Sequence, residues 1–176
     1  MTITVFGSSR CAEGSEEYKL AYELGRAIAA AGHSVCNGGF GGTMEACARG
    51  AKEAGGSTIG VTIQLFGQSA NPWIDQTIRT NTLVERLLKL IELGDAFVTL
   101  RGGTGTLLEL AAVWEMMNKG IIPARPLLTF EPFWTPLIRM MAEELYVWST
   151  GSPVIVQQVR TPEECARALE ELLPKT

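Results

Sequence analysis

The sequence predicts an α/β domain with a Rossmann-like parallel β-sheet flanked by helices on both faces. Three observations carry this prediction: short β-branched runs alternate with longer helical patterns, glycine-rich turns join strands to helices, and 46% of the 176 residues are apolar. Strands that alternate with helices run parallel, because each helix returns the chain to the edge where the previous strand began. No linker-like or low-complexity tract divides the chain, so residues 1–176 are expected to form a single domain.

The first half of the chain repeats a strand, a turn and a helix. Runs of β-branched residues predict the strands, and apolar residues three or four positions apart predict helices that end at glycines. The predicted elements are a strand at Ile3–Phe6, a helix at Ser15–Ala31, a strand at His33–Cys36, a helix at Thr43–Ala54 and a strand at Thr58–Ile63.

The second half begins with an irregular stretch, Gln64–Thr80, which we expect to be a loop with a short strand at Gln76–Arg79 and a place for a lid or a partner contact. Leu83–Leu93 is a predicted helix that is apolar around most of its circumference, so we expect it to be buried on more than one side, with a second subunit as one cover. The remaining predictions are a strand at Ala96–Leu100, a helix that ends at Lys119, a strand at Pro126–Phe130, a helix at Phe133–Tyr146, a strand at Pro153–Val156 and a helix at Pro162–Leu173.

The charge balance argues against two classes of partner. Fifteen Lys and Arg against nineteen Asp and Glu give a net charge of −4, so we expect no binding to nucleic acid or to an anionic membrane. The cysteines form no C-x-x-C pair and His33 is the one histidine, so no metal site is expected. The amino-terminal residues lack a basic leader, and no apolar run approaches the ~20 residues of a membrane span, which predicts a cytoplasmic protein with reduced thiols.

Two glycine-rich turns each follow a predicted strand and precede a predicted helix. The first glycine turn is Gly38–Gly42, and the second is Gly102–Thr106. In a parallel sheet such turns lie at the carboxyl ends of the strands, where backbone N–H groups and a helix N-terminus bind phosphate. Neither turn has the spacing of G-x-G-x-x-G or the ending of a P-loop, so NAD binding and ATP hydrolysis are not the first interpretation. The alternative is two tight connections without a ligand.

Glu109 allows two interpretations. Residues 106–109 read T-L-L-E, the spacing of a capping box with Thr106 as N-cap, and the same spacing recurs at Thr82–Glu85 and Thr161–Glu164. Because Glu109 follows the second glycine turn, its carboxylate would also lie one helical turn from a bound phosphate and close to the attached sugar. A carboxylate there stabilises positive charge that develops on the sugar, or orients a water molecule.

Three arginines are candidates for local positive charge. Arg86 lies on the apolar helix, where it is either an exposed residue paired with a neighbour such as Glu85 or a buried functional group. Arg79 and Arg101 lie in or beside the loops at the expected ligand edge of the sheet. A phosphate ligand needs such a local cation, since the chain as a whole is acidic.

The run from Asp95 to Glu109, D-A-F-V-T-L-R-G-G-T-G-T-L-L-E, resembles the P-G-G-x-G-T-x-x-E signature of the Lonely Guy family. This family comprises cytokinin-activating nucleoside 5′-monophosphate phosphoribohydrolases, many of which were long labelled possible lysine decarboxylases. V-F-G-S-S-R at residues 5–10, the first glycine turn with the helix after it, and Glu85-Arg86 are similar to the family's pattern in the same order. The resemblance covers nearly the whole chain and is strongest up to Glu109.

The resemblance implies a homodimer that cleaves the N-glycosidic bond of AMP or of a cytokinin-type nucleotide to give the free base and ribose 5-phosphate, with no cofactor and no metal. Arg86 and Glu109 match the catalytic pair of the family. The positions that the resemblance places at the bound substrate are Ser8, Ser9, Gly39, Gly42, Arg101, Gly102, Gly103, Thr104, Gly105 and Thr106.

Several departures from the family pattern favour a second hypothesis. Arg101 replaces a proline, Leu87 replaces the lysine of an Arg-Lys pair, and the first glycine turn differs from G-G-G-x-x-G-L-M. They suggest an outlying branch in which non-catalytic proteins also occur, so the alternative is a carrier or sensor that binds a phosphorylated nucleotide or cofactor in the same cleft. A purely structural protein is the third alternative. A pyridoxal-phosphate decarboxylase is excluded on chemical grounds, because no lysine follows a strand in the predicted site.

Overall fold

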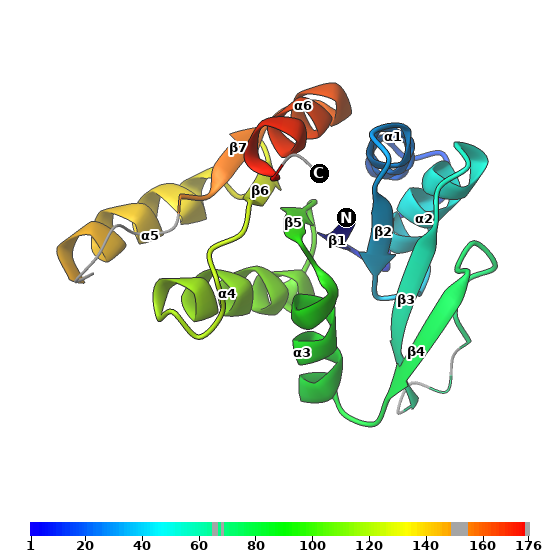
Figure 1. Ribbon diagram of the computed structural model, residues 1–176, viewed down its shortest axis with the longest axis horizontal. Helices are drawn as coiled ribbons and strands as arrows, with labels where there is room; N and C mark the ends of the chain where they lie inside the picture. Colours follow the sequence, from blue (N-terminus) through cyan, green and yellow to red (C-terminus); the bar gives the residue numbers. More distant parts are fainter. Residues whose placement is uncertain (65–66, 68, 149–154, 175–176) are drawn as a thin grey trace.

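A computed structural model describes residues 1–64, 67, 69–148 and 155–174. Its seven strands form one sheet in the order β4-β3-β2-β1-β5-β6-β7, and all neighbouring strands pair in parallel (Figure 1). The strands are β1 (Thr2–Phe6), β2 (Ser34–Asn37), β3 (Thr58–Ile63), β4 (Gln76–Thr80), β5 (Ala96–Thr99), β6 (Leu127–Phe130) and β7 (Gln157–Val159). The predicted Rossmann-like α/β fold is confirmed.

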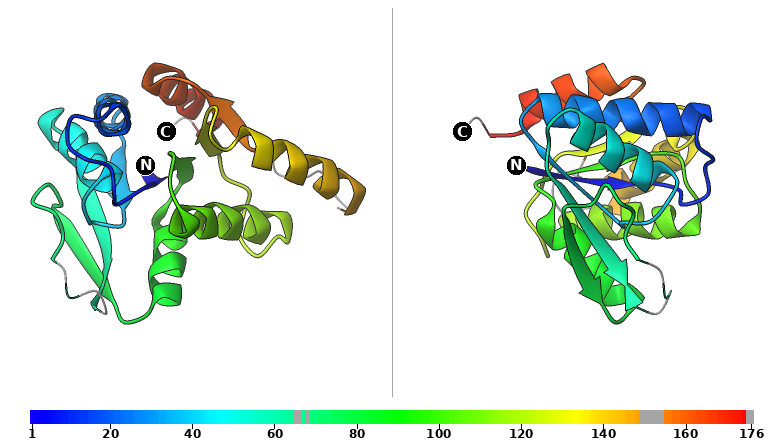
Figure 2. Two further views of the ribbon diagram at one scale, coloured as in Figure 1. Left: turned by 180° about the vertical axis from the view of Figure 1, so that it is seen from behind. Right: turned by 90° about the vertical axis from the view of Figure 1, so that its right-hand side faces the viewer.

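Helices cover both faces of the sheet (Figures 1 and 2). The helices are α1 (Glu16–Ala30), α2 (Thr43–Glu53), α3 (Leu83–Leu93), α4 (Thr104–Asn118), α5 (Thr135–Trp148) and α6 (Pro162–Leu172). One apolar cluster joins the sheet to α1, α2 and α6, and a second joins its other face to α3, α4 and α5. Within the described part of the chain, no helix is both long and apolar enough to cross a membrane.

The strand order places a topological switch point beside β1. The chain moves from β1 to β2 and β3 on one side of β1, then returns after β4 through α3 to β5 on the other side. The loops after β1 and β5 therefore diverge to opposite faces and leave a crevice at the carboxyl ends of these two strands. In open parallel sheets this crevice is where ligands bind.

Within the connection from β3 to β4, none of the residues that the structure describes belongs to an α-helix. Its last part lies flat against the sheet because Gly60 of β3 has no side chain, and a Cβ there would lie 2.9 Å from the side chain of Ile74. The expected short strand in this region is confirmed as β4.

The described part of the predicted strand at Pro153–Val156 is not a strand, since Ile155 and Val156 precede β7. Residues 153 and 154 lie outside the described residues, and the following strand is β7 at Gln157–Val159. Its position is set by pairing with β6, in which Val159 lies opposite Phe130. Apolar runs are a poor signal for an edge strand, which has a neighbour on one side only and tolerates polar residues.

Helix α3 buries one side in this chain rather than several. Leu90 and Ile91 pack in the core, whereas the side chains of Leu83, Val84 and Leu88 are 47%, 63% and 48% exposed. The exposed apolar residues form a surface, called here the α3 face, that no other part of the described chain covers.

Helices α1 and α2 approach each other backbone to backbone. A Cβ at Gly25 would lie 2.0 Å from the carbonyl oxygen of Cys47, and one at Gly50 would lie 2.0 Å from that of Tyr22. The two glycines therefore fix how closely the helices pack, although glycine disfavours a helix interior by about 1 kcal/mol relative to alanine.

Gly25→Ala is expected to lower the free energy of unfolding by about 1–3 kcal/mol, because the methyl group overpacks the contact between α1 and α2. Gly105→Ala is the matched control: it also lies in a helix, and a Cβ there meets nothing within 4 Å. Urea unfolding of both variants measures the difference. Equal stability of the two variants would contradict the close contact.

Candidate active site

A cleft of about 510 Å³ occupies the crevice at the switch point. Residues 7–10 after β1 form one wall, and the N-terminus of α4 with Glu109 forms the wall beside it. Phe40, Met44, Leu83 and Arg86, from α2, α3 and the turn before α2, close the remaining side. The cleft has the size of a small-molecule site.

Arg86 is a buried residue of α3 with three kinds of contact. Its side chain extends to β3, where Nε donates a hydrogen bond of 2.8 Å to the carbonyl oxygen of Val61. The guanidinium carbon lies 5.6 Å from the centre of the Phe40 ring. Nη2 is so close to Gly38 that a Cβ there would lie 1.7 Å from it. With 8% of the residue exposed, the interpretation of Arg86 as an exposed helix residue is wrong.

Glu109 faces Arg86 across the cleft wall. Nη1 of Arg86 donates to Oε1 of Glu109 at 3.4 Å, and only 10% and 14% of the two side chains are exposed. Burial raises the pKa of Glu109 to about 7, and the positive charge of Arg86 opposes this rise only in part. Burial also lowers the pKa of Arg86, which nevertheless stays charged at neutral pH.

The interpretation of Glu109 as part of a capping box is wrong. Helix α4 begins at Thr104 with Gly103 as N-cap, so Thr106 lies inside the helix and Glu109 points to Arg86 instead. The two other predicted caps are formed, since Thr82 accepts from the amide of Glu85 and Thr161 accepts from that of Glu164.

The N-terminus of α4 is open toward the cleft. Gly103 offers no side chain to cap the helix, and the backbone N–H groups of Thr104, Gly105 and Thr106 have no acceptor among the residues that the structure describes. Gly102 allows the turn to close tightly, because a Cβ there would lie 2.1 Å from the hydroxyl oxygen of Thr106. Unpaired N–H groups at a helix N-terminus are suited to bind an anion.

The first glycine turn shapes the cleft without lining it at Gly39 or Gly42. Both glycines have positive φ, 74° and 69°. A Cβ at Gly42 would lie 2.3 Å from the carbonyl oxygen of Ser8, which accepts hydrogen bonds from both the amide and the hydroxyl of Thr43. This contact holds the loop after β1 against α2 and leaves Ser8 and Ser9 on the cleft wall.

The predicted substrate residues other than Arg101 thus divide into two groups. Those that line the cleft are Ser8, Ser9, Gly103, Thr104, Gly105 and Thr106, together with Arg86 and Glu109. Gly39, Gly42 and Gly102 do not line the cleft; they allow close backbone packing next to it, because a Cβ at each would clash with a neighbouring group. Leu87, in place of the family's lysine, packs against the core and not in the cleft.

Two predicted cations lie elsewhere. Arg101 lies 3.4 Å from Glu17, over the ring of Phe133, and does not line the cleft. Arg79 lines a separate cavity of about 460 Å³ between β3, β4 and their connection. The cleft instead contains Arg10, which the sequence reasoning missed and whose side chain forms no ion pair within the described residues. Its position directly after Ser8-Ser9, at the carboxyl end of β1, was the sequence signal that could have identified Arg10 as a cleft residue.

Among the residues that the structure describes, no three His, Cys, Asp or Glu side chains come together in a way that would hold a metal ion. The polar groups of the cleft are backbone amides, the side chains of Ser8, Ser9, Thr104 and Thr106, Arg10 and the Arg86–Glu109 pair.

Sequence comparison finds named hydrolases among the relatives. The chain is 39% identical over 103 residues to the cytokinin riboside 5′-monophosphate phosphoribohydrolase of Mycobacterium tuberculosis, an alignment that spans 57% of this chain and 55% of that protein. It is 38% identical over 111 residues to an uncharacterized protein of Archaeoglobus fulgidus, spanning 63% and 72% of the two chains. The alignments with the named hydrolases span 55% to 64% of their lengths.

Structural comparison confirms the fold over nearly the whole chain. The molybdenum cofactor binding protein of Rippkaea orientalis superimposes with a TM-score of 0.76 at 26% sequence identity and covers 97% of this chain and 95% of that one. Residues 1–165 match the profile of the SLOG cluster4 family. The predicted resemblance to the Lonely Guy phosphoribohydrolases is confirmed, and the chain belongs to the SLOG cluster4 family.

Proposed function

We propose that this protein hydrolyses the N-glycosidic bond of a nucleoside 5′-monophosphate, AMP or a cytokinin-type nucleotide, to the free base and ribose 5-phosphate. The observation that carries the proposal is the buried Arg86–Glu109 pair beside the open N-terminus of α4, in one cleft. The names of the mycobacterial and Rhodococcoides fascians relatives support this reaction.

The 5′-phosphate would bind at the second glycine turn. The amides of Thr104, Gly105 and Thr106 would donate to its oxygens, and the helix dipole adds favourable potential. Arg10, on the adjacent wall after β1, would add a formal positive charge next to the phosphate, whereas the amides and the helix dipole carry partial charges. This arrangement gives an acidic protein a local site for an anion.

The sugar would then lie next to Glu109, about one helical turn from the phosphate. As the bond between C1′ and the base nitrogen breaks, its electron pair leaves with the base, which takes up a proton. The carboxylate of Glu109 stabilises the positive charge that develops on the sugar, and water adds to C1′ with loss of its proton. Arg86 holds Glu109 in place through the 3.4 Å contact.

A carrier that binds a phosphorylated ligand without hydrolysis is the second candidate. It is favoured by the likeness to the molybdenum cofactor binding protein, which covers nearly the full length of both chains. The two functions share the cleft and the phosphate contacts, and they differ in whether Glu109 performs chemistry.

We also propose that the α3 face is covered by a second copy of the chain. Leu83 belongs both to this face and to the wall of the cleft, so a partner that packs on the α3 face would also narrow the entrance. A homodimer of this kind would keep bulk water out of the cleft while leaving room for the water molecule that reacts, which strengthens the electrostatic contribution of Glu109.

A product assay tests the hydrolase. Incubation with AMP and other nucleoside monophosphates, followed by chromatography, is expected to yield base and ribose 5-phosphate, and Glu109→Gln is expected to lower kcat by about 10²-fold or more. Glu115→Gln, on the same helix but exposed and paired with Lys119, is the control that retains activity. Nucleotide binding with no turnover above that of Glu109→Gln would support the carrier instead.

The activity is expected to rise with pH through about 7. Glu109 has a raised pKa of about 7, so it is protonated below this value and becomes the required carboxylate above it. A pH profile of kcat between pH 5 and 9 measures this acidic limb. Activity that falls as the pH rises through 7 would show that Glu109 works in its protonated form.

Arg10→Ala is expected to weaken AMP binding by about tenfold to hundredfold, because a hydrogen bond to a charged group is lost, and to leave adenosine binding unchanged. Arg101→Ala is the matched control, since Arg101 pairs with Glu17 outside the cleft. Calorimetry in the Glu109→Gln background measures binding without turnover. Equal losses for AMP and adenosine would mean that Arg10 does not contact the phosphate.

A further inference from the structure

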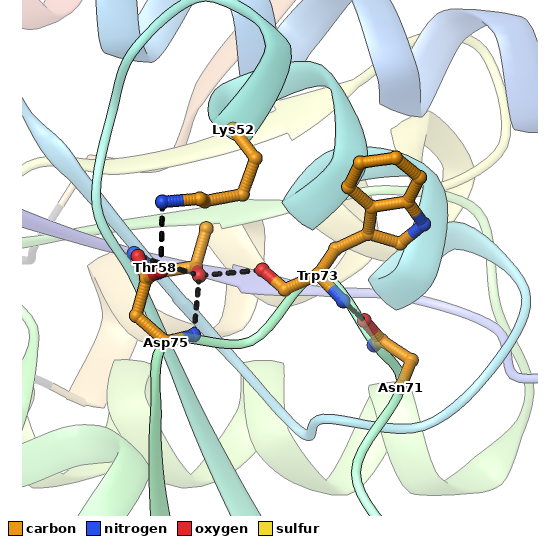
Figure 3. A network of polar contacts seen from close by, with 5 residues as sticks. All are labelled: Lys52, Thr58, Asn71, Trp73 and Asp75. Atoms are coloured by element: carbon orange, nitrogen blue, oxygen red, sulfur yellow. Dashed lines mark hydrogen bonds and ion pairs between the residues drawn. The ribbon is translucent and has the colours of Figure 1, made fainter.

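Asn71, in the connection between β3 and β4, holds the first glycine turn by its carbonyl groups. Its backbone amide donates to the carbonyl oxygen of Gly39 at 2.8 Å. Its side-chain Nδ2 donates to the carbonyl oxygens of Gly39 at 3.1 Å and of Phe40 at 2.9 Å. The side-chain oxygen accepts from the amide of Trp73 at 3.0 Å, which fixes the orientation of the amide group (Figure 3).

The same glycine turn forms one side of the space around the Arg86 guanidinium. Gly38 approaches Nη2 too closely for any side chain, and Phe40 places its ring 5.6 Å from the guanidinium carbon. The hydrogen bond from Nε to Val61 fixes the other end of the group. A shift of the turn would therefore move Nη1 relative to Glu109.

A second asparagine, Asn37, also holds the first glycine turn, but through other backbone groups than Asn71 does. Asn37, which is fully buried, accepts from the amide of Gly39 at 2.8 Å and donates to the carbonyl oxygen of Met44 at 2.9 Å. These bonds fix the start of the turn. Among the described residues, Asn71 makes the side-chain hydrogen bonds to the Gly39 and Phe40 carbonyls.

The other end of the connection is fixed by further contacts, and Trp73 joins the two ends, because its amide donates to Asn71 and its carbonyl accepts from Thr58. Asp75 accepts from the amide of Thr58 at 2.9 Å and forms an ion pair of 2.7 Å with Lys52 of α2, and the hydroxyl of Thr58 donates to the carbonyl oxygen of Trp73 (Figure 3). None of these residues lines the cleft or contacts Arg86. The connection between β3 and β4 is therefore held at two places, by Asn71 and by Asp75. Of these two residues, Asn71 is the one that hydrogen-bonds to the glycine turn.

We propose that Asn71 is a positioning residue for Arg86, acting through the Gly38–Phe40 backbone to set the guanidinium against Glu109. The expected effect on catalysis rests on the proposed function, whereas the effect of Asn71 on the position of Arg86 does not. Asn71 does not line the cleft, so we expect it to act on the rate and not on the affinity. Misplacement of a catalytic group by a fraction of an ångström to 1 Å lowers rates by up to about 10²-fold.

The test compares Asn71→Asp with Asp75→Asn. Asn71→Asp retains size and the acceptor for Trp73 but replaces the donor with a carboxylate opposite two carbonyl oxygens. Asp75→Asn loosens the other end of the same segment, so it controls for a general loss of stability. We expect Asn71→Asp to lower kcat about tenfold or more with KM within about twofold, and Asp75→Asn to retain kcat. Equal kcat for both variants at matched melting temperature would overturn the proposal.

A second readout needs no turnover. The carboxyl carbon of Glu109, assigned by comparison with Glu109→Gln, is titrated by NMR in the substrate-free protein. Arg86 is the charged group that faces Glu109, and the Cys36 thiol beside Arg86 has a pKa raised to about 12 by burial and stays neutral. A displaced Arg86 raises the pKa of Glu109, so we expect a higher pKa in Asn71→Ala, which removes the donor without adding a charge, than in the unsubstituted protein.

The two readouts separate the outcomes. A raised pKa without turnover in any variant means that the hydrolase proposal fails and the positioning role stands. An unchanged pKa in Asn71→Ala overturns the positioning role, whether or not the protein is a hydrolase.

Discussion

The buried charge of Arg86 is the constraint on which the site depends. A guanidinium removed from water is costly unless its donors are paired, and here the carbonyl oxygen of Val61 and the carboxylate of Glu109 accept from it. The remaining surface of the group is filled by the Gly38 backbone and the Phe40 ring. Residues from β3, α4 and the first glycine turn are therefore fixed relative to one another by a single side chain of α3.

The succession of strands and helices along the chain and the glycine stops were readable from the sequence because they follow from local chemistry. Alternation of strand and helix, glycine stops and the two T-x-x-E caps at Thr82 and Thr161 are all short-range signals, and the structure confirms them. The cleft-lining part of the second glycine turn, Gly103–Thr106, was found in the same way. The edge strand β7 was misplaced, because its position depends on a partner strand distant in sequence.

Contacts across the sheet were beyond local reasoning. The burial of Arg86 depends on the hydrogen bond from Nε to the Val61 carbonyl oxygen. The identity of residue 61 does not predict that its carbonyl oxygen accepts a bond from a side chain. The direction of Arg101 depends on Glu17, which is far from it in the sequence. Asn71 gave no signal either, since an asparagine before a proline is ordinary in a loop. Glu109 illustrates the middle case: its spacing fitted a cap, and only the start of α4 at Thr104 decided between the two interpretations.

Both edges of the sheet discourage addition of a further strand. β7 has three residues, two of them glutamine, and β4 exposes Gln76, Thr77 and Arg79. Short, polar or charged edges of this kind are how natural proteins prevent edge-to-edge pairing and aggregation. Growth of the sheet from one molecule into the next is thereby disfavoured. Most of the large apolar side chains that the described chain leaves exposed lie instead on helices, among them Leu83, Val84 and Leu88 of α3.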